Sequence, residues 1–297
     1  IVLVGPTAVG KTAVAIQLAK QVKAEIISAD SRQFFREMNI GTAKPSVEEL
    51  AAAPHYMVNH LSIEDSYSVG QFEKEVLTLL NQLFKKNRVA ILVGGSGLYV
   101  DAVCNGLDEF PAVDPKYREQ LNEQLKVEGI GPLQQQLAQK DPSYYEEVDR
   151  QNPQRLIRAL EVILSTGKTY SSFRKRKKIE RPFEVIKIGL EMDRAHIYER
   201  IDRRMEMMIE QGLFDEAASL YDYRELNALQ TVGYTEIFGY LDGEYDKEEA
   251  IRLLKRNSRR YAKRQLTWFK REPLTHWFHP DQLNEMLALI EEQIKSA

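Results

Sequence analysis

Short apolar runs alternate along this chain with longer stretches in which apolar residues recur every three or four positions. Short runs are typical of strands buried on both faces of a sheet, and the longer periodic stretches are typical of amphipathic helices. The runs predict strands at residues 1–4, 25–29, 89–93, 185–190 and 275–278. Because helical patterns separate them, we expect an α/β fold with a mostly parallel sheet.

One stretch departs from this alternation. It opens at residues 111–115, which include two prolines, is rich in helical patterns as far as Thr166, and closes at Pro182. We interpret it as a mostly helical insertion within a core domain. The predicted insertion domain is residues 111–182, and the predicted core domain is residues 1–110 and 183–297.

The residues after the first predicted strand carry the most specific motif of the chain. Gly5-Pro6-Thr7-Ala8-Val9-Gly10-Lys11-Thr12 matches the pattern G-x-x-x-x-G-K-[ST] and leads into a predicted helix over residues 12–24. In this pattern backbone N–H groups and the helix start bind phosphates, the lysine reaches outer phosphate oxygens, and the last hydroxyl can hold Mg2+. The motif predicts a P-loop NTPase-like core that binds linked phosphates, but it does not identify the reaction.

Two further candidates follow predicted strands, where a parallel sheet places its chemistry. Asp30 could bind magnesium through water, act as a general base, or only cap the local backbone. Ser96 lies in a glycine-rich segment after the third strand. Because residues 90–97 contain no acidic residue, an ATPase is disfavoured. Ser96 could then contact phosphate or leaving-group oxygens, or have only a structural role.

The pattern of residues 197–212 predicts an amphipathic helix with two arginines beside its buried stripe. Arg200 and Arg204 are one turn apart, and one of them could clamp a departing pyrophosphate. The alternative is a surface arginine paired with Glu199 or Asp202, and spacing alone favours this alternative.

Composition narrows the class of protein. The chain has 297 residues and one cysteine, Cys104. A single cysteine excludes an internal disulfide framework and a cysteine-cluster zinc site, so we expect a reducing, cytoplasmic location. No apolar stretch reaches the length needed to cross a membrane, so we expect no membrane partner.

Charge is distributed unevenly. The formal net charge is -3, but residues 252–271 carry nine basic residues and no acidic one, and residues 150–182 carry ten against two. The rest of the chain is correspondingly acidic and would repel a polyanion except along these two segments. Tyr261, Trp268 and Phe269 lie within the C-terminal segment. We interpret both segments as RNA-binding, with a solvated helix face as the alternative.

Several motifs together carry a resemblance to a known family. In chain order they are GPTAVGKT, ADSRQ, GTAKP, GGSGLY, QNPQRLIRALEV, RIDRRMEMMIEQGL, VGYTE and AKRQLTWFK, at residues 5–12, 29–33, 41–45, 94–99, 151–162, 200–213, 232–236 and 262–270. With these motifs the chain resembles the tRNA dimethylallyltransferases nearly from end to end. The resemblance implies transfer of a dimethylallyl group from dimethylallyl diphosphate to the N6 amine of the adenosine next to the anticodon, with release of pyrophosphate.

The resemblance also implies residue roles. Asp30 would accept the proton of the adenosine amine, and Ser96 and Arg204 would stabilise the departing pyrophosphate. Thr12 would bind Mg2+, the implied cofactor. The P-loop would hold pyrophosphate rather than ATP, through Gly5, Thr7, Ala8, Gly10, Lys11 and Thr12. The residues that would contact the anticodon stem-loop of tRNA are Asp30, Ser31, Arg32, Gln33, Gln154, Arg155, Arg158, Gln230, Gly233, Tyr234, Lys263, Arg264, Gln265, Trp268 and Lys270.

Other functions remain open from the residues alone. A P-loop small-molecule or nucleotide kinase would share the phosphate cradle and an aspartate after the next strand. A non-catalytic RNA-binding P-loop protein, or an enzyme that prenylates free adenine nucleotides, would share the core. The leading interpretation is a monomeric transferase that modifies tRNA.

Overall fold

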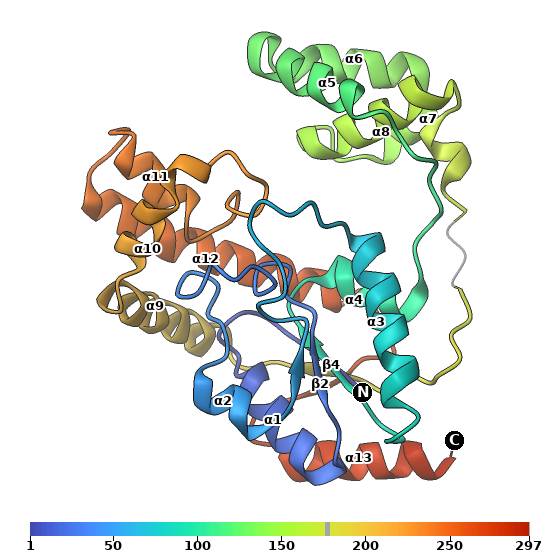
Figure 1. Ribbon diagram of the computed structural model, residues 1–297, viewed down its shortest axis with the longest axis vertical. Helices are drawn as coiled ribbons and strands as arrows, with labels where there is room; N and C mark the ends of the chain where they lie inside the picture. The colour runs from blue at the N-terminus through green and yellow to red at the C-terminus, as the bar shows by residue number, and fades with distance from the viewer. Residues whose placement is uncertain (176–178, 297) are drawn as a thin grey trace. The chain divides into compact units, whose positions relative to one another are not determined.

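The computed structural model describes residues 1–175 and 179–296 (Figure 1). Residues 176–178, which belong to one of the predicted basic segments, lie outside the described residues. Contacts within the chain divide it into two compact units, Ile1–Asn105 with Arg181–Ala297, and Gly106–Glu180. The first is called the core unit and the second the helical unit.

In the described residues, the core unit is built on a six-stranded sheet in the order β3-β2-β4-β1-β5-β6, and every neighbouring pair of strands is parallel. This confirms the predicted α/β fold with a parallel sheet. Because β1 lies between β4 and β5, the P-loop leaves the middle of the sheet. The strands are β1 (Val2–Val4), β2 (Ile26–Ser28), β3 (His55–Tyr56), β4 (Ile91–Gly94), β5 (Lys187–Leu190) and β6 (His276–Phe278).

The strands differ from the predicted ones in number and length. The apolar pattern does not predict β3, because its two residues are too few to show an alternation and both are only half-buried. The predicted strands at 89–93 and 185–190 begin two residues too early. Two apolar residues precede each of these strands and extend the apolar run, which explains the error. Before β5 the hydrogen bonding also continues, since the N–H of Val2 donates to the carbonyl oxygen of Ile186 at 2.8 Å.

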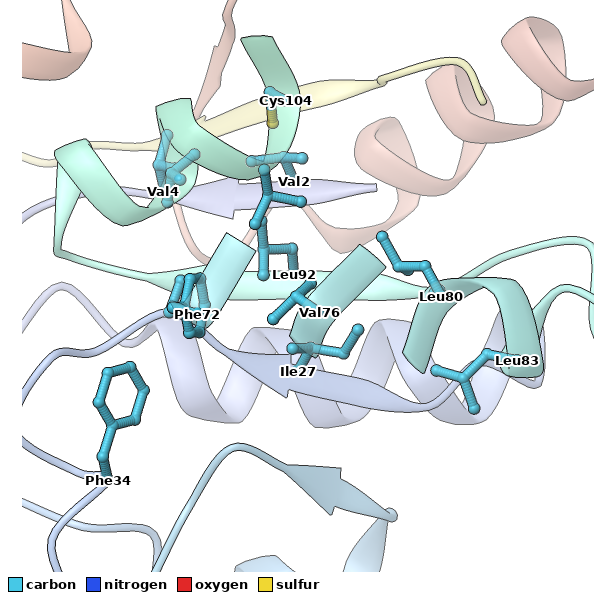
Figure 2. Close-up of a cluster of buried hydrophobic side chains, with 14 of the residues drawn as sticks. Val2, Val4, Ile27, Phe34, Phe72, Val76, Leu80, Leu83, Leu92 and Cys104 are labelled. Atoms are coloured by element: carbon cyan, nitrogen blue, oxygen red, sulfur yellow. The ribbon is translucent and has the colours of Figure 1, made fainter. Parts of the chain in front are cut away.

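Helices cover both faces of the sheet. On one face α3 (Val69–Leu83) and α4 (Gly97–Asn105) share an apolar cluster with Val2 and Val4 of β1 (Figure 2). On the other face α1 (Lys11–Val22) and α13 (Leu283–Ser296) share a cluster with Leu3. Consecutive residues of β1 therefore enter opposite cores, and each buried Val or Leu contributes roughly 1.5–3 kcal/mol. This two-sided burial explains the unbroken apolar runs of the sequence.

The helices that follow β5 pack around a third apolar cluster, which includes Met205, Leu213, Tyr234 and Leu254. The predicted amphipathic helix at 197–212 corresponds to α9. The remaining elements of the core unit are α2 (Val47–Ala52), α9 (Arg194–Glu210), α10 (Leu213–Ser219), the 3-10 turn η2 (Tyr221–Tyr223), α11 (Thr235–Leu241) and α12 (Lys247–Phe269).

The helical unit has its own apolar core, which includes Leu133, Leu137, Leu156 and Leu160. A proline stands in the first turn of each α-helix of this unit, where its missing N–H costs nothing. The elements that the structure describes here are α5 (Pro115–Glu128), α6 (Gly131–Lys140), α7 (Pro142–Glu147), α8 (Pro153–Thr166) and the 3-10 turn η1 (Tyr170–Phe173).

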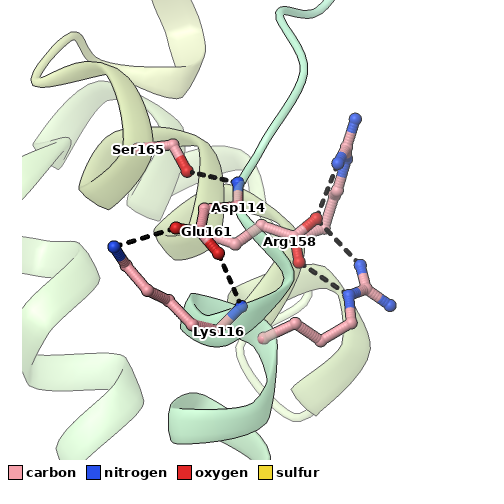
Figure 3. A network of polar contacts seen from close by, with 6 residues as sticks. Asp114, Lys116, Arg158, Glu161 and Ser165 are labelled. Atoms are coloured by element: carbon pink, nitrogen blue, oxygen red, sulfur yellow. Dashed lines mark hydrogen bonds and ion pairs between the residues drawn. The ribbon is translucent and has the colours of Figure 1, made fainter.

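A buried carboxylate joins α5 to α8 in this unit. The side chain of Glu161 has no exposed surface and forms ion pairs of 2.6 Å with Arg118 and with Arg158 (Figure 3). Beside it, the N–H of Asp114 donates to the hydroxyl of Ser165 at 3.1 Å. Burial alone would favour the neutral carboxyl, but hydrogen bonds from the two arginines lower the pKa of Glu161.

Candidate active site

The P-loop connects β1 to α1 through a tightly curled backbone. Gly5, Ala8 and Gly10 have positive φ values of 152°, 63° and 107°. Gly5 also has no room for a side chain, since a Cβ there would lie 2.7 Å from the carbonyl oxygen of Leu190. The first amides of α1, which have no partner within the helix, begin where this turn ends. Such a turn favours anions through its N–H groups and the helix dipole.

Lys11 folds back over the turn. Its Nζ donates to the carbonyl oxygens of Gly5 at 3.0 Å and of Pro6 at 2.7 Å. Burial lowers the pKa of Lys11 to about 8, while Asp30 opposes this shift and Arg204 adds to it. A desolvated cation with neutral carbonyl partners gains stability when an anion binds beside it.

A pocket of about 110 Å³ lies beside the P-loop, within the core unit. Its polar lining includes Thr7, Asp30 and Arg204. Its apolar lining includes Ile201, Met205, Met208, Leu213 and Val232. The helix α9 therefore supplies both a cation and an apolar stripe to the same pocket. This combination suits a ligand with an anionic head and a short apolar tail.

The two predicted catalytic residues that follow strands lie on adjacent loops. The N–H of Arg32 donates to Oδ1 of Asp30 at 3.0 Å, which holds the carboxylate in a local turn. The hydroxyl of Ser96 accepts the N–H of Ser31 at 3.0 Å and donates to the Ser31 hydroxyl at 3.2 Å. The structure therefore brings the loop after β4 to within hydrogen-bonding distance of the loop after β2.

The two arginines of α9 both reach the P-loop region, in different ways. Arg204 lines the pocket, where burial lowers its pKa and the nearby carboxylates Asp30 and Glu49 oppose that shift. Arg200 donates from Nε to the carbonyl oxygen of Ala8 at 2.7 Å. Among the described residues, neither arginine pairs with Glu199 or Asp202, the partners that spacing favours. Asp202 pairs instead with Arg259 of α12.

Comparison with known proteins identifies the family. The family model described as "IPP transferase" matches residues 33–272. A protein of Christiangramia forsetii, named tRNA dimethylallyltransferase, is 54% identical over 280 residues, which are 94% of this chain and 93% of that protein. The chain belongs to this family. A tRNA dimethylallyltransferase 1 of Bacteroides fragilis is 51% identical and covers 99% of this chain and 98% of its own length.

Solved structures of tRNA dimethylallyltransferases share the fold. The tRNA isopentenylpyrophosphate transferase of Bacillus halodurans superimposes with a TM-score of 0.72 at 39% identity, over 99% of this chain and 97% of that one. A eukaryotic dimethylallyltransferase, described as acting on tRNA, gives a TM-score of 0.71 at 27% identity, over 90% of this chain and 68% of that one. Family membership favours prenyl transfer over the kinase alternative. None of the helices in the described residues is long and apolar enough to span a membrane.

Tyr261 lines the pocket, although the sequence motifs do not assign it to the site. Burial, together with the nearby Asp30 carboxylate, raises the pKa of its hydroxyl to about 12. Ser258 of the same helix also lines the pocket. The three-residue spacing of Ser258 and Tyr261 on a helix is the signal that could have placed both on one face.

The residues of α12 and its C-terminal cap Lys270 that have a predicted RNA role lie in different environments. Lys263 and Arg264 are exposed. Gln265 is only 6% exposed and bonds to the P-loop. Trp268 is half-buried, with its Nε1 donating to Asp101 at 2.9 Å. Lys270 is exposed but pairs with Glu191 at 2.8 Å. The structure therefore separates this motif into an outward and an inward set.

The predicted RNA residues near the pocket divide in a similar way. Arg32 lines the pocket and donates to the carbonyl oxygen of Asn227 at 2.9 Å. Gln33 donates to the carbonyl oxygen of Ala43 at 3.1 Å. Tyr234 is fully buried, and its hydroxyl bonds to Glu216 at 2.7 Å. Tyr234 therefore packs inside the core unit, with no side-chain surface exposed in this structure. Gly233, its neighbour in the motif, is also buried, whereas Gln230 just before the motif is exposed.

The three predicted RNA residues of the helical unit lie on the first two turns of α8. Gln154 and Arg155 are exposed, while Arg158 is half-buried and held by Glu161. Arg155 has no ion-pair partner among the residues that the structure describes. Of these three, Arg155 is thus the cation that is available to a polyanion.

Proposed function

We propose that this protein transfers the dimethylallyl group of dimethylallyl diphosphate to the N6 amine of the adenosine next to the anticodon of tRNA, with release of pyrophosphate. The observation that carries this proposal is the pocket, where Arg204 and the apolar stripe of α9 meet Asp30 and the P-loop. Cations and amides suit the diphosphate head, and the apolar stripe suits the prenyl tail. The names of the relatives support the same substrates.

The proposed reaction is a direct displacement. The amine nitrogen forms a bond to the allylic carbon, the carbon–oxygen bond of the donor breaks, and its electron pair leaves with pyrophosphate. Asp30 accepts the proton that the amine loses. Lys11, Ser96 and Arg204 stabilise the negative charge of the leaving pyrophosphate.

The P-loop residues fit a magnesium ion. Thr12 is half-buried in the first turn of α1, and among the described residues its hydroxyl has no hydrogen-bond partner. A hydroxyl beside a diphosphate site is the kind of hard oxygen ligand that Mg2+ accepts while it keeps several waters. When bound, the ion would neutralise part of the pyrophosphate charge.

Binding of tRNA is assigned to exposed cations on both units. On the core unit these are Lys263 and Arg264 of α12, and on the helical unit Arg155 of α8. Because the pocket lies inside the core unit, the target base must leave the base stack to reach Asp30. The proposal takes the protein as a cytoplasmic monomer.

One assay tests the function. Radiolabelled dimethylallyl diphosphate is offered with a substrate tRNA, with the same tRNA carrying guanosine next to the anticodon, with AMP, or with buffer. We expect label to move only to the unaltered tRNA. Label on AMP but not on tRNA would overturn the proposal. Phosphate transfer from ATP in a parallel reaction would favour a kinase instead.

A further inference from the structure

The inward face of α12 places an amide between the two loops of the active site. The N–H of Thr7 in the P-loop donates to Oε1 of Gln265 at 2.7 Å. The Nε2 of Gln265 donates to the carbonyl oxygen of Gly95 at 3.0 Å. Gln265 is only 6% exposed, and both the oxygen and the nitrogen of its amide form hydrogen bonds within the protein. This side chain therefore links the loop after β1 to the loop after β4.

Two glycines make room for this contact. A Cβ on Gly95 would lie 2.2 Å from Nε2 of Gln265, and a Cβ on Gly97 would lie 2.2 Å from Cδ1 of Trp268. Trp268 is itself held by Asp101. The two side chains of α12 thus fit against the glycines on either side of Ser96. The close fit gives the loop little freedom to move along the helix.

The bond to Gln265 also decides how the P-loop is used. The N–H of Thr7 already donates to Gln265, so it is not among the P-loop amides that are free to bind a diphosphate. Lys11 lies close to the same contact, since its Nζ is 3.7 Å from the position of a Cβ on Gly95. A shift of the Gln265 amide would therefore move the P-loop and the Ser96 loop relative to each other.

We propose that Gln265 is a positioning residue, which holds the P-loop and the Ser96 loop at the spacing that a diphosphate requires and does not contact RNA. This inference rests on the proposed function. It differs from the RNA contact that the motif of α12 suggests. Its neighbours Lys263 and Arg264 keep the RNA role, so one helix would bind RNA with its outer face and set the active site with its inner face.

The first experiment measures binding of inorganic pyrophosphate and of tRNA, by calorimetry and filter binding, to wild type and to Gln265→Leu. Leucine keeps most of the volume but leaves the Thr7 N–H and the Gly95 carbonyl without partners. We expect pyrophosphate affinity to fall roughly ten- to hundredfold, with tRNA affinity within about twofold of wild type. Lys263→Ala is the matched variant on the same helix, and it should show the opposite pattern.

A second variant, Gln265→Glu, gives a signature that packing alone does not. When neutral, the introduced carboxyl can accept the Thr7 N–H and donate to the Gly95 carbonyl, as the amide does. When ionised, it has no donor and places a negative charge beside the cradle, close to Lys11. The ratio of the variant and wild-type pyrophosphate affinities should therefore rise as pH falls, approaching tenfold per pH unit.

The outcomes separate the alternatives. Weaker tRNA binding in Gln265→Leu with unchanged pyrophosphate affinity would make Gln265 an RNA contact and overturn the inference. Unchanged affinities for both ligands, or a pH-independent ratio for Gln265→Glu, would also overturn it. If wild type binds pyrophosphate but transfers no label to tRNA, the proposed function fails while the pyrophosphate titrations still decide the role of Gln265. Wild-type protein that binds no pyrophosphate would overturn both.

Discussion

Two clusters of carboxylate and cations, one in each unit, use burial in opposite ways. In the helical unit Arg118 and Arg158 pair directly with Glu161, and hydrogen bonds raise the pKa of Arg118. In the core unit burial lowers the pKa of Lys11 and of Arg204. Within the part of the chain that the structure describes, no ion pair reaches Asp30.

The presence or absence of direct ion pairs separates cations that stabilise the fold from cations that are available to bind a ligand. Both arginines form direct ion pairs with Glu161, and the pair with Arg118 stabilises the contact between α5 and α8. The cations around Asp30 remain under-neutralised, and an anion with several oxygens would restore what burial removed. Desolvated and unpaired cations therefore mark the binding site better than the number of basic residues does.

The largest expected effect comes from the carboxylate of the core cluster. Asp30→Asn keeps the shape but removes the proposed base, so turnover should fall by roughly 10²- to 10⁴-fold. Affinity for tRNA should stay within about twofold of wild type. Single-turnover transfer of labelled prenyl groups and filter binding of tRNA measure the two effects. An equal loss of tRNA binding would show that Asp30 belongs to the RNA contacts instead.

The carboxylate of the helical cluster should show the opposite behaviour. Glu161→Gln leaves two arginines without their buried partner, and we expect a loss of about 2 kcal/mol in the stability of this unit. Turnover per folded molecule should change little. Hydrogen exchange over residues 115–166 measures the stability loss. Glu146→Gln removes the exposed partner of Arg150 and serves as the control, with an expected loss of less than about 0.5 kcal/mol.

The depressed pKa of Lys11 gives the core cluster a pH dependence. Protonated Lys11 favours an anionic ligand, and the pKa of this group in the free protein is about 8. Pyrophosphate affinity should therefore be retained below pH 8 and be lost as pH rises above it, by up to about tenfold per unit. Titrations from about pH 6 to about pH 10, expressed relative to Lys11→Met, remove the titration of the ligand itself. A constant ratio would contradict the assignment.

The smallest effects distinguish free cations from paired ones. Lys263→Ala with Arg264→Ala should reduce the salt dependence of tRNA binding by about two units of log–log slope, and Arg155→Ala by about one. Arg259→Ala should change the slope by less than either, because Arg259 already pairs with Asp202. If removing the ion-paired Arg259 changed the salt dependence of tRNA binding as much as removing an unpaired cation, the distinction between the two kinds of cation would be wrong.

The sequence predicted the parts of the fold and of the site that depend on neighbours along the chain. The motif at residues 5–12, the strand runs around it and the loops with Asp30 and Ser96 all lie where the pattern predicts. The roles of the site residues remain predictions that the experiments above test. The pattern of apolar residues did not predict the strand β3 or the position of Tyr261 in the pocket. A two-residue strand and the orientation of a helix leave little signal in the local sequence.

The sequence by itself determined where most helices and strands form and predicted that linked phosphates bind after β1, because periodicity and turn chemistry act over a few residues. Only the tertiary structure decided which basic residues stay free, that Tyr234 is buried, and that Gln265 turns inward to the P-loop. Ion pairing and burial act through space between segments far apart in the chain, and Asp202 with Arg259 shows this across 57 residues. The net charge of a segment therefore does not show which of its basic residues are free to bind a polyanion, because that depends on their ion-pair partners elsewhere in the chain.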